Sequence, residues 1–200
     1  MLISFEKKLV FFHIPKTGGV SVRSLLEKYK DIDKEDYSHK LSRKIDGKSV
    51  WLIDPLHINQ KQAKELYDLD GYNEFTVVRE PFERIVSLYN YGNNSMLFKS
   101  FSEFMKVVEK HYLRPNSYRE IYNSQLYWIT SNTMILKLED IVLDPIGEFK
   151  KIDIDITVFP KENEAVKIKY KPTDEEKAYC LNFLVEEYER LNYSKPGESC

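Results

Sequence analysis

The segment from Leu9 to Arg23, LVFFHIPKTGGVSVR, constrains the fold of this chain more than any other. Its first four residues are apolar, which is typical of a short buried strand. A proline, a lysine, a threonine and two glycines follow before a helix-compatible sequence begins. The pattern predicts a strand, a tight loop and a helix N-terminus, where unpaired backbone N–H groups and the helix dipole attract anions.

The side chains of this loop have the chemistry of a phosphate or sulfate site. Gly18 and Gly19 let the main chain approach a ligand closely, and Lys16 supplies a positive charge. Thr17 and Ser21 supply hydroxyl donors. A Walker A loop would place the lysine after the glycines, whereas here it precedes them. The remaining alternative is an ordinary strand-to-helix turn, which rarely gathers these residue types.

Length and composition indicate one globular domain spanning residues 1–200. The 30 Lys and Arg residues against 32 Asp and Glu give a net charge of -2, which does not favour nucleic acid as a partner. Cys180 and Cys200 do not form a disulfide framework, so we expect a cytoplasmic protein. The N-terminal sequence MLISFEKK has no long apolar run, so no signal or membrane anchor is expected.

Strand and helix patterns alternate along the chain. Strands are expected at 9–12, 49–54, 74–79, 133–138 and 154–159. Helices are expected at 20–29, 59–69, 81–91, 102–110, 117–129 and 139–151 and from 173 onward. The charged stretch 31–48 is expected to be a surface excursion. The alternation predicts a three-layer α/β fold, with a central parallel sheet of four to five strands and helices on both faces.

A second candidate phosphate contact follows the strand at 74–79. Arg79 closes that strand, and Ser87 follows eight residues later on the next helix. Ligands of open α/β sheets collect outside the carboxyl ends of the strands. A guanidinium and a hydroxyl placed there can converge on one phosphate. Either residue alone is common on protein surfaces, so the prediction depends on their occurrence together with the anion-binding loop.

The order H-I-P-K-T-G-G directly after a strand resembles the 5'-phosphosulfate loop of sulfotransferases that use 3'-phosphoadenosine 5'-phosphosulfate (PAPS). Arg79 and Ser87 resemble the 3'-phosphate motif of the same family. The chain is most similar to the carbohydrate branch that includes heparan sulfate 2-O-sulfotransferases. Later stretches at 123–129 and 136–145, and the closing EEYERLNY, also resemble that branch.

The resemblance implies a P-loop-like fold, PAPS as sulfuryl donor, 3'-phosphoadenosine 5'-phosphate (PAP) as product, and a hydroxyl acceptor that is expected to be a glycan. The residues that it implies for donor binding are Lys16, Thr17, Gly18, Gly19, Val20, Ser21, Arg79 and Ser87. Many members have a hydroxyl residue at the position of Val20, so here only the backbone N–H is expected to contact the donor. A loop that closes over the nucleotide is expected within 163–170.

Sulfuryl transfer is an in-line displacement, in which the protein positions the reactants and stabilises charge on the departing phosphate. Lys16 is the candidate for that charge. His57, which follows the strand predicted at 49–54, is the candidate general base, and a histidine at the start of the helix after that strand resembles the branch's proposed catalytic position. Glu80 and Asp54 are the carboxylate alternatives, and a capping or packing role for His57 also stays open.

The other histidines are not expected to act. His13 is interpreted as a structural hydrogen-bonding residue, and His39 and His111 as solvated side chains. No cluster has metal-ligand spacing, so we expect no metal and an activity that chelators leave intact. The polar and aromatic residues that are available for a sugar groove, or equally for the core, are Tyr91, Tyr112, Arg114, Tyr118, Arg119, Tyr122 and Trp128.

Two other classes of function stay open from the sequence. A nucleotide kinase or other P-loop phosphotransferase would depend on magnesium and would need a metal-binding aspartate such as Asp54. A non-catalytic nucleotide-binding protein on the same scaffold would bind the donor tightly without turnover.

Overall fold

The computed structural model describes residues 1–37, 40, 42–45, 48–51, 55–93, 97–115, 120–160 and 170–195. The strands are β1 (Leu2–Ser4), β2 (Leu9–Phe12), β3 (Ser42–Ile45), β4 (Lys48–Trp51), β5 (Asn73–Val78) and β6 (Thr133–Lys137). The α-helices are α1 (Gly19–Leu26), α2 (Lys34–Tyr37), α3 (Gln60–Lys64), α4 (Pro81–Asn93), α5 (Phe101–Leu113), α6 (Leu138–Leu143), α7 (Pro145–Lys150), α8 (Asp174–Phe183) and α9 (Val185–Arg190). The short 3-10 helices are η1 (Glu27–Tyr29), η3 (Glu120–Tyr122) and η4 (Gln125–Trp128).

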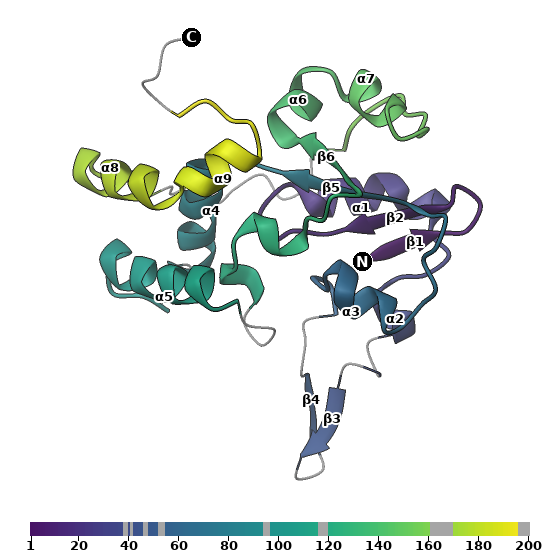
Figure 1. The fold of residues 1–200 in the computed structure, drawn as a ribbon, viewed down its shortest axis with the longest axis horizontal. Coiled ribbons are helices and arrows are strands. Elements are labelled where there is room, and N and C mark those ends of the chain that lie inside the picture. Colours follow the sequence, from purple (N-terminus) through teal and green to yellow (C-terminus); the bar gives the residue numbers. More distant parts are fainter. Residues whose placement is uncertain are drawn as a thin grey trace.

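A four-stranded sheet with the order β1-β2-β5-β6 forms the centre of the fold (Figure 1). β2 pairs with β5, and β5 with β6, in parallel, so that Phe11 lies opposite Phe75 and Phe75 lies opposite Met134. All of β2 and all of β5 except Asn73 are buried, which explains why these strands read as apolar runs. The carboxyl ends of both strands point toward α4.

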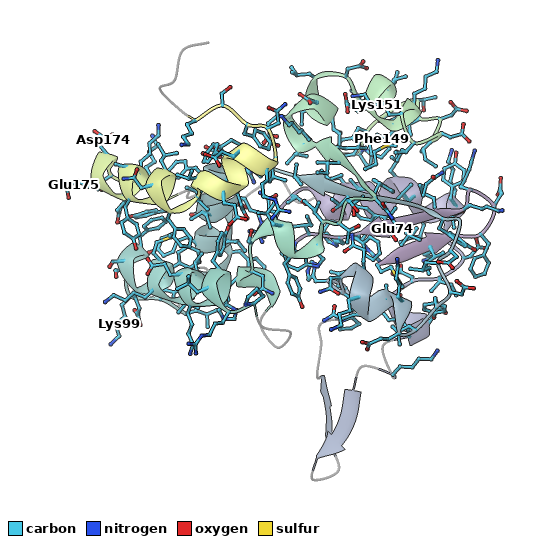
Figure 2. All side chains as sticks on the ribbon, viewed as in Figure 1. Glu74, Lys99, Phe149, Lys151, Asp174 and Glu175 are labelled. Atoms are coloured by element: carbon cyan, nitrogen blue, oxygen red, sulfur yellow. The ribbon has the colours of Figure 1, made fainter. Side chains whose placement is uncertain are left out.

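Helices cover both faces of this sheet. On one face, Phe11 and Phe75 belong to a buried cluster with residues of α1, α6 and α7, among them Val22 and Phe149. On the other face, Val10 and Phe12 pack with Tyr37, Ile58, Ala63 and Leu69. Figure 2 shows Phe149 among side chains close to the sheet, whereas the labelled side chain of Lys99 projects from the periphery. The α/β architecture that the sequence predicts is therefore confirmed.

A second apolar cluster lies beyond the carboxyl ends of the strands and is built from α4, α5, α8 and α9 (Figure 1). Its buried members are Phe82, Ile85, Leu88, Tyr89, Phe101, Phe104, Met105, Val108, Tyr122, Cys180, Leu184 and Tyr188. Thr173 caps α8 through a reciprocal pair of hydrogen bonds with Glu176, where the sequence predicts the start of a helix. Among the helices that the structure describes, none combines the length and the apolar character that a membrane span requires.

The central sheet differs from the prediction at its first edge and in one strand. β1 was not expected, and it pairs antiparallel with β2 because only a tight turn joins the two strands. Residues 49–51, the described part of the strand predicted at 49–54, do not belong to this sheet. Instead, β4 pairs antiparallel with β3 in a separate two-stranded sheet, within and beside the stretch that we expected to be an irregular excursion.

Three other elements are shorter or more broken than predicted. Residues 154–159 form no strand, although Ile154 is buried in the core. The helix predicted at 117–129 is two 3-10 turns, η3 and η4, in the part of it that the structure describes. The helix predicted at 139–151 breaks at Asp144, whose side chain accepts a hydrogen bond from the Gly147 N–H and so starts α7 anew.

Two residues opposite one another in the sheet provide a test of this packing. Phe75 on β5 is fully buried, whereas its ladder neighbour Met134 on the edge strand β6 is 43% exposed. We expect Phe75→Ala to lower the free energy of unfolding by about 3–5 kcal/mol, because it leaves a cavity between two layers. Met134→Ala should cost less than half as much, as measured by urea unfolding. Equal losses would contradict the packing described.

Candidate functional site

The loop between β2 and α1 has the backbone geometry of an anion-binding loop. β2 ends at Phe12 and α1 begins at Gly19, so residues 13–18 form the connection. Lys16 and Gly18 have φ angles of 68° and 80°, in the left-handed region. The first turn of α1 contains no acidic residue, so no carboxylate on that turn opposes the attraction between the helix N-terminus and an anion.

Packing explains why both glycines of the loop are needed. A Cβ atom on Gly18 would lie 2.7 Å from Leu138 Cδ1, and one on Gly19 would lie 1.9 Å from His13 Cδ2. The Thr17 hydroxyl is fully buried and donates a hydrogen bond to the Ile14 carbonyl at 3.0 Å. This hydroxyl therefore braces the loop from within, which the sequence pattern did not reveal.

The two predicted contact residues in the first turn of α1 differ in exposure. The Val20 side chain is 39% exposed, whereas Ser21 is only 6% exposed. An exposed apolar side chain at this position offers no hydrogen bond, so the polar group that Val20 contributes to the turn is its backbone N–H. The backbone contact between Val20 and the donor stays a prediction.

Lys16 and Arg79 lie close to one another, although they follow different strands. The Lys16 ammonium lies 4.7 Å from the centre of the Tyr91 ring on α4. Burial lowers the pKa of Lys16, and the positive charge of Arg79 lowers it further. The two cations therefore repel one another, and a bound anion would relieve this repulsion. The structure therefore brings together the two cations on which the predicted site depends.

One face of α4 connects these cations and includes Ser87. Arg79 Nη2 pairs with Glu83 Oε2 at 3.2 Å, and Lys16 lies over Tyr91. Glu83, Ser87 and Tyr91 are spaced four residues apart, so they share one helix face. Ser87 is half-buried and lies between the residues that contact the two cations. The predicted pairing of Arg79 with Ser87 therefore points to the same place as the loop.

His57 is buried beside the loop, although it does not follow a strand of the central sheet. Its Nδ1 lies 2.8 Å from the His13 carbonyl oxygen, and the two imidazole rings are 4.6 Å apart. A carbonyl oxygen only accepts hydrogen bonds, so Nδ1 carries the proton and the lone pair of a neutral His57 is on Nε2. The Trp128 indole donates to the His57 carbonyl at 2.6 Å and fixes the backbone.

The His13 ring packs against Gly19 and is buried. Burial lowers the pKa of His13 well below its ordinary value, and the neighbouring charge of His57 lowers it further. His13 is therefore neutral at physiological pH. Its ring occupies the space beside the helix N-terminus, which agrees with a structural role, but its Nδ1 is buried without a hydrogen-bond partner among the described residues, and the hydrogen bond to His57 is accepted by the main-chain carbonyl.

The carboxylate alternatives to His57 differ in what the structure says of them. Glu80 accepts a hydrogen bond from the Glu83 N–H at 2.6 Å through Oε2 and from the Tyr188 hydroxyl through Oε1. Both carboxylate oxygens thus already accept hydrogen bonds at the start of α4. This favours a role for Glu80 as a helix cap over a role as the general base. Asp54 lies outside the described residues, as do the whole of 163–169 and His39.

Arg84 supports the site in a way that sequence reasoning missed. It is fully buried on α4, and its Nε donates to the Pro15 carbonyl in the anion-binding loop at 3.0 Å. Its Nη2 donates to the Asn123 carbonyl at 3.1 Å. Arg84 therefore ties the loop to α4 and to the segment before η4. An arginine in a helical pattern ordinarily indicates a solvent-exposed position. The one sequence signal for another role is that Arg84 lies about one helical turn before Ser87.

The predicted acceptor residues divide between core and surface. Tyr122 and Trp128 are buried core residues, whereas Tyr91 and Arg114 are exposed. Tyr118 and Arg119 lie outside the described residues. The prediction that His111 is solvated is wrong: it is 6% exposed, and its Nδ1 lies 3.3 Å from Asn123 Oδ1.

The contact between Gly19 and His13 gives a test of the loop. Alanine would ordinarily favour a helix by about 1 kcal/mol over glycine. We expect Gly19→Ala instead to destabilise the protein by about 1–3 kcal/mol in urea unfolding, because the added methyl group overlaps the His13 ring. The same change in a His13→Ala background should cost clearly less. An equal cost in both backgrounds would contradict the contact.

Comparison with known proteins identifies one family. The sequence pattern of the sulfotransferase family matches residues 1–158, which include the loop, His57, Arg79 and Ser87. Comparisons with curated proteins and with solved structures gave no significant match. Because the matched segment covers more than half of the 200 residues, the chain belongs to the sulfotransferase family.

Proposed function

We propose that this sulfotransferase transfers the sulfuryl group of PAPS to a hydroxyl of a carbohydrate acceptor, on a P-loop-like scaffold of one domain. The observation that carries the proposal is that Lys16 and Arg79 follow two adjacent parallel strands and both contact α4, Lys16 at Tyr91 and Arg79 at Glu83. PAPS has negative charge at both its 5' and 3' ends. Two cations from separate loops lie next to a helix N-terminus. This arrangement suits a ligand that is charged at two ends better than it suits a ligand with a single phosphate group.

The donor is held in two parts. The backbone N–H groups at the start of α1, from Gly18 to Ser21, bind the 5'-phosphosulfate together with Lys16. Arg79 and Ser87 bind the 3'-phosphate from the end of β5 and from the facing side of α4. Thr17 contributes its backbone, since its hydroxyl is already bonded to Ile14. The protein groups that bind the nucleotide are held in place before the nucleotide binds, which lowers the entropic cost of binding.

The reaction is an in-line displacement at sulfur. The acceptor oxygen forms a bond to sulfur as the bond between sulfur and the 5'-phosphate oxygen breaks, and PAP leaves. Lys16 stabilises the charge that develops on the departing phosphate. The acceptor proton passes to Nε2 of His57, whose tautomer is set by the hydrogen bond between Nδ1 and the His13 carbonyl.

The acceptor class depends on the resemblance to the carbohydrate branch and stays a prediction. Tyr91 is an exposed aromatic residue beside Lys16, and such a ring can stack on a sugar. Among the residues that the structure describes, no group of three or more His, Cys, Asp or Glu side chains is placed to hold a metal ion. Sulfation of a glycan panel with labelled PAPS tests the proposed acceptor directly.

Donor binding depends on Lys16 and Arg79 separately. We expect Lys16→Ala and Arg79→Ala each to weaken PAP binding by about 1.5–3 kcal/mol, because each removes a charge-assisted contact. Isothermal titration calorimetry measures this, with Lys28→Ala on η1 as the control for the loss of an exposed lysine. Wild-type affinity in both site variants would show that the site is misassigned.

Catalysis and donor binding separate at His57. We expect His57→Ala to lower kcat by at least about 100-fold while PAP affinity stays within about twofold of wild type, because a general base acts on the acceptor proton. Steady-state kinetics and calorimetry on the same preparation measure the two quantities. Retention of wild-type kcat in the variant would exclude His57 as the base. A wild-type protein that binds PAP but shows no turnover would instead indicate a binding function.

A further inference from the structure

The main chain of Arg79 extends beyond the hydrogen-bonding ladder of the sheet. The last residue of β5 paired with β6 is Val78, and pairing with β2 already ends at Thr76. No strand that the structure describes pairs with Arg79, so its N–H and C=O need other hydrogen-bond partners. The Gln125 side chain provides both: Oε1 accepts from Arg79 N at 3.0 Å, and Nε2 donates to Arg79 O at 2.9 Å.

A buried carboxylate from α9 fixes Gln125 in turn. Glu187 is 2% exposed, and its Oε1 accepts from the Gln125 backbone N–H at 2.6 Å. Its Oε2 lies 3.4 Å from Gln125 Nε2. A carboxylate only accepts hydrogen bonds, so Glu187 favours the same amide orientation that the two bonds to Arg79 require, with Nε2 toward the carboxylate and Oε1 toward the Arg79 N–H. Glu187 therefore reinforces the orientation of this amide.

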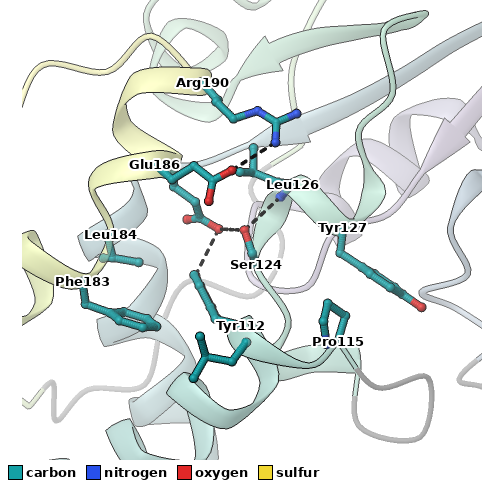
Figure 3. A pocket seen from close by; sticks show the side chains of 11 residues that line it. Tyr112, Pro115, Ser124, Leu126, Tyr127, Phe183, Leu184, Glu186 and Arg190 are labelled. Carbon is teal, nitrogen blue, oxygen red and sulfur yellow. Dashed lines mark hydrogen bonds and ion pairs between the residues drawn. The ribbon is translucent and has the colours of Figure 1, made fainter.

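Two hydroxyl groups compensate the burial of the Glu187 carboxylate. Ser124 Oγ donates to Oε1 at 2.6 Å and the Tyr112 hydroxyl donates at 3.0 Å. Burial raises the pKa of Tyr112 well above its ordinary value, and the Glu187 charge raises it further, so this hydroxyl stays a donor. Figure 3 shows Tyr112 and Ser124 lining one pocket, with dashed lines running from both toward α9.

Tyr188, which follows Glu187 on α9, contacts Glu80, which follows Arg79. The Tyr188 hydroxyl donates to Glu80 Oε1, while Glu187 reaches Arg79 through Gln125. Two adjacent residues of α9 thus hold Arg79 and the residue that follows it. α9 lies outside residues 1–158, the part of the chain that matches the family pattern.

We propose that Glu187 is a positioning residue of the donor site, which acts through Gln125 on the main chain of Arg79 and so directs the guanidinium toward the 3'-phosphate. The proposal rests on the proposed function, since it assumes that Arg79 binds that phosphate. It predicts a selective effect: loss of the Glu187 carboxylate weakens only the contacts that Arg79 makes.

Two nucleotides and two adjacent glutamates test the proposal. We expect Glu187→Gln to weaken PAP binding at least about tenfold, because the new amide competes for the orientation of Gln125. Binding of adenosine 5'-monophosphate, which lacks the 3'-phosphate, should change less than twofold. Glu186→Gln is the matched control, because Glu186 is exposed and pairs with Arg190 on the surface of α9. Competition calorimetry measures the affinity of both nucleotides for each variant and for the wild-type protein.

A combined variant separates positioning from a general loss of structure. In an Arg79→Ala background, Glu187→Gln should cause less than a twofold further loss of PAP affinity, because the group that it positions is gone. A protein that is merely destabilised would lose affinity in both backgrounds and for both nucleotides, and that result would overturn the proposal. Should Glu187→Gln fail to fold, Gln125→Leu makes the same test with the carboxylate retained.

The two hypotheses fail differently. If the wild-type protein does not bind PAP, or if Arg79→Ala binds it normally, the proposed donor site is wrong. If wild-type binding depends on Arg79 but Glu187→Gln keeps wild-type affinity and KM for PAPS, only the positioning role is wrong.

Discussion

The parallel pairing of β2 with β5 is the constraint on which the rest of the structure depends. With Phe11 opposite Phe75, the two strands end on the same side of the sheet and only a few residues apart. The loop after β2 and Arg79 after β5 are therefore neighbours, although more than 60 residues separate them in the chain. A shift of the ladder by one residue would move each strand's side chains to the opposite face and would separate Lys16 from Arg79.

Buried polar groups hold the ends of these strands where the ladder stops. Arg84 bonds the Pro15 carbonyl, and Gln125 bonds both main-chain groups of Arg79. Burying such groups costs free energy unless they are hydrogen-bonded, so each is stable only in the arrangement observed. The cost favours one geometry of the loops over many alternatives, which suits the proposed binding of a nucleotide at both its 5' and 3' ends.

The parts of the site that the sequence predicts are those encoded within a few residues. The strand, loop and helix from Leu9 onward and the spacing of Arg79 and Ser87 carry their geometry locally, and the structure places them together. His57 was located through a strand of the central sheet, yet β4 pairs elsewhere and the residue reaches the loop through a contact with the His13 carbonyl. Such a contact spans 44 residues, and no local pattern encodes it.

The contacts between α9 and the end of β5 join two parts of the chain that the family pattern treats differently. The end of β5 lies inside residues 1–158, which match the pattern, whereas α9 lies outside them. The buried Glu187 carboxylate accepts hydrogen bonds from Ser124, Tyr112 and Gln125, and Gln125 in turn bonds the main chain of Arg79. A substitution in α9 can therefore alter the end of β5 while every residue of the family pattern stays the same.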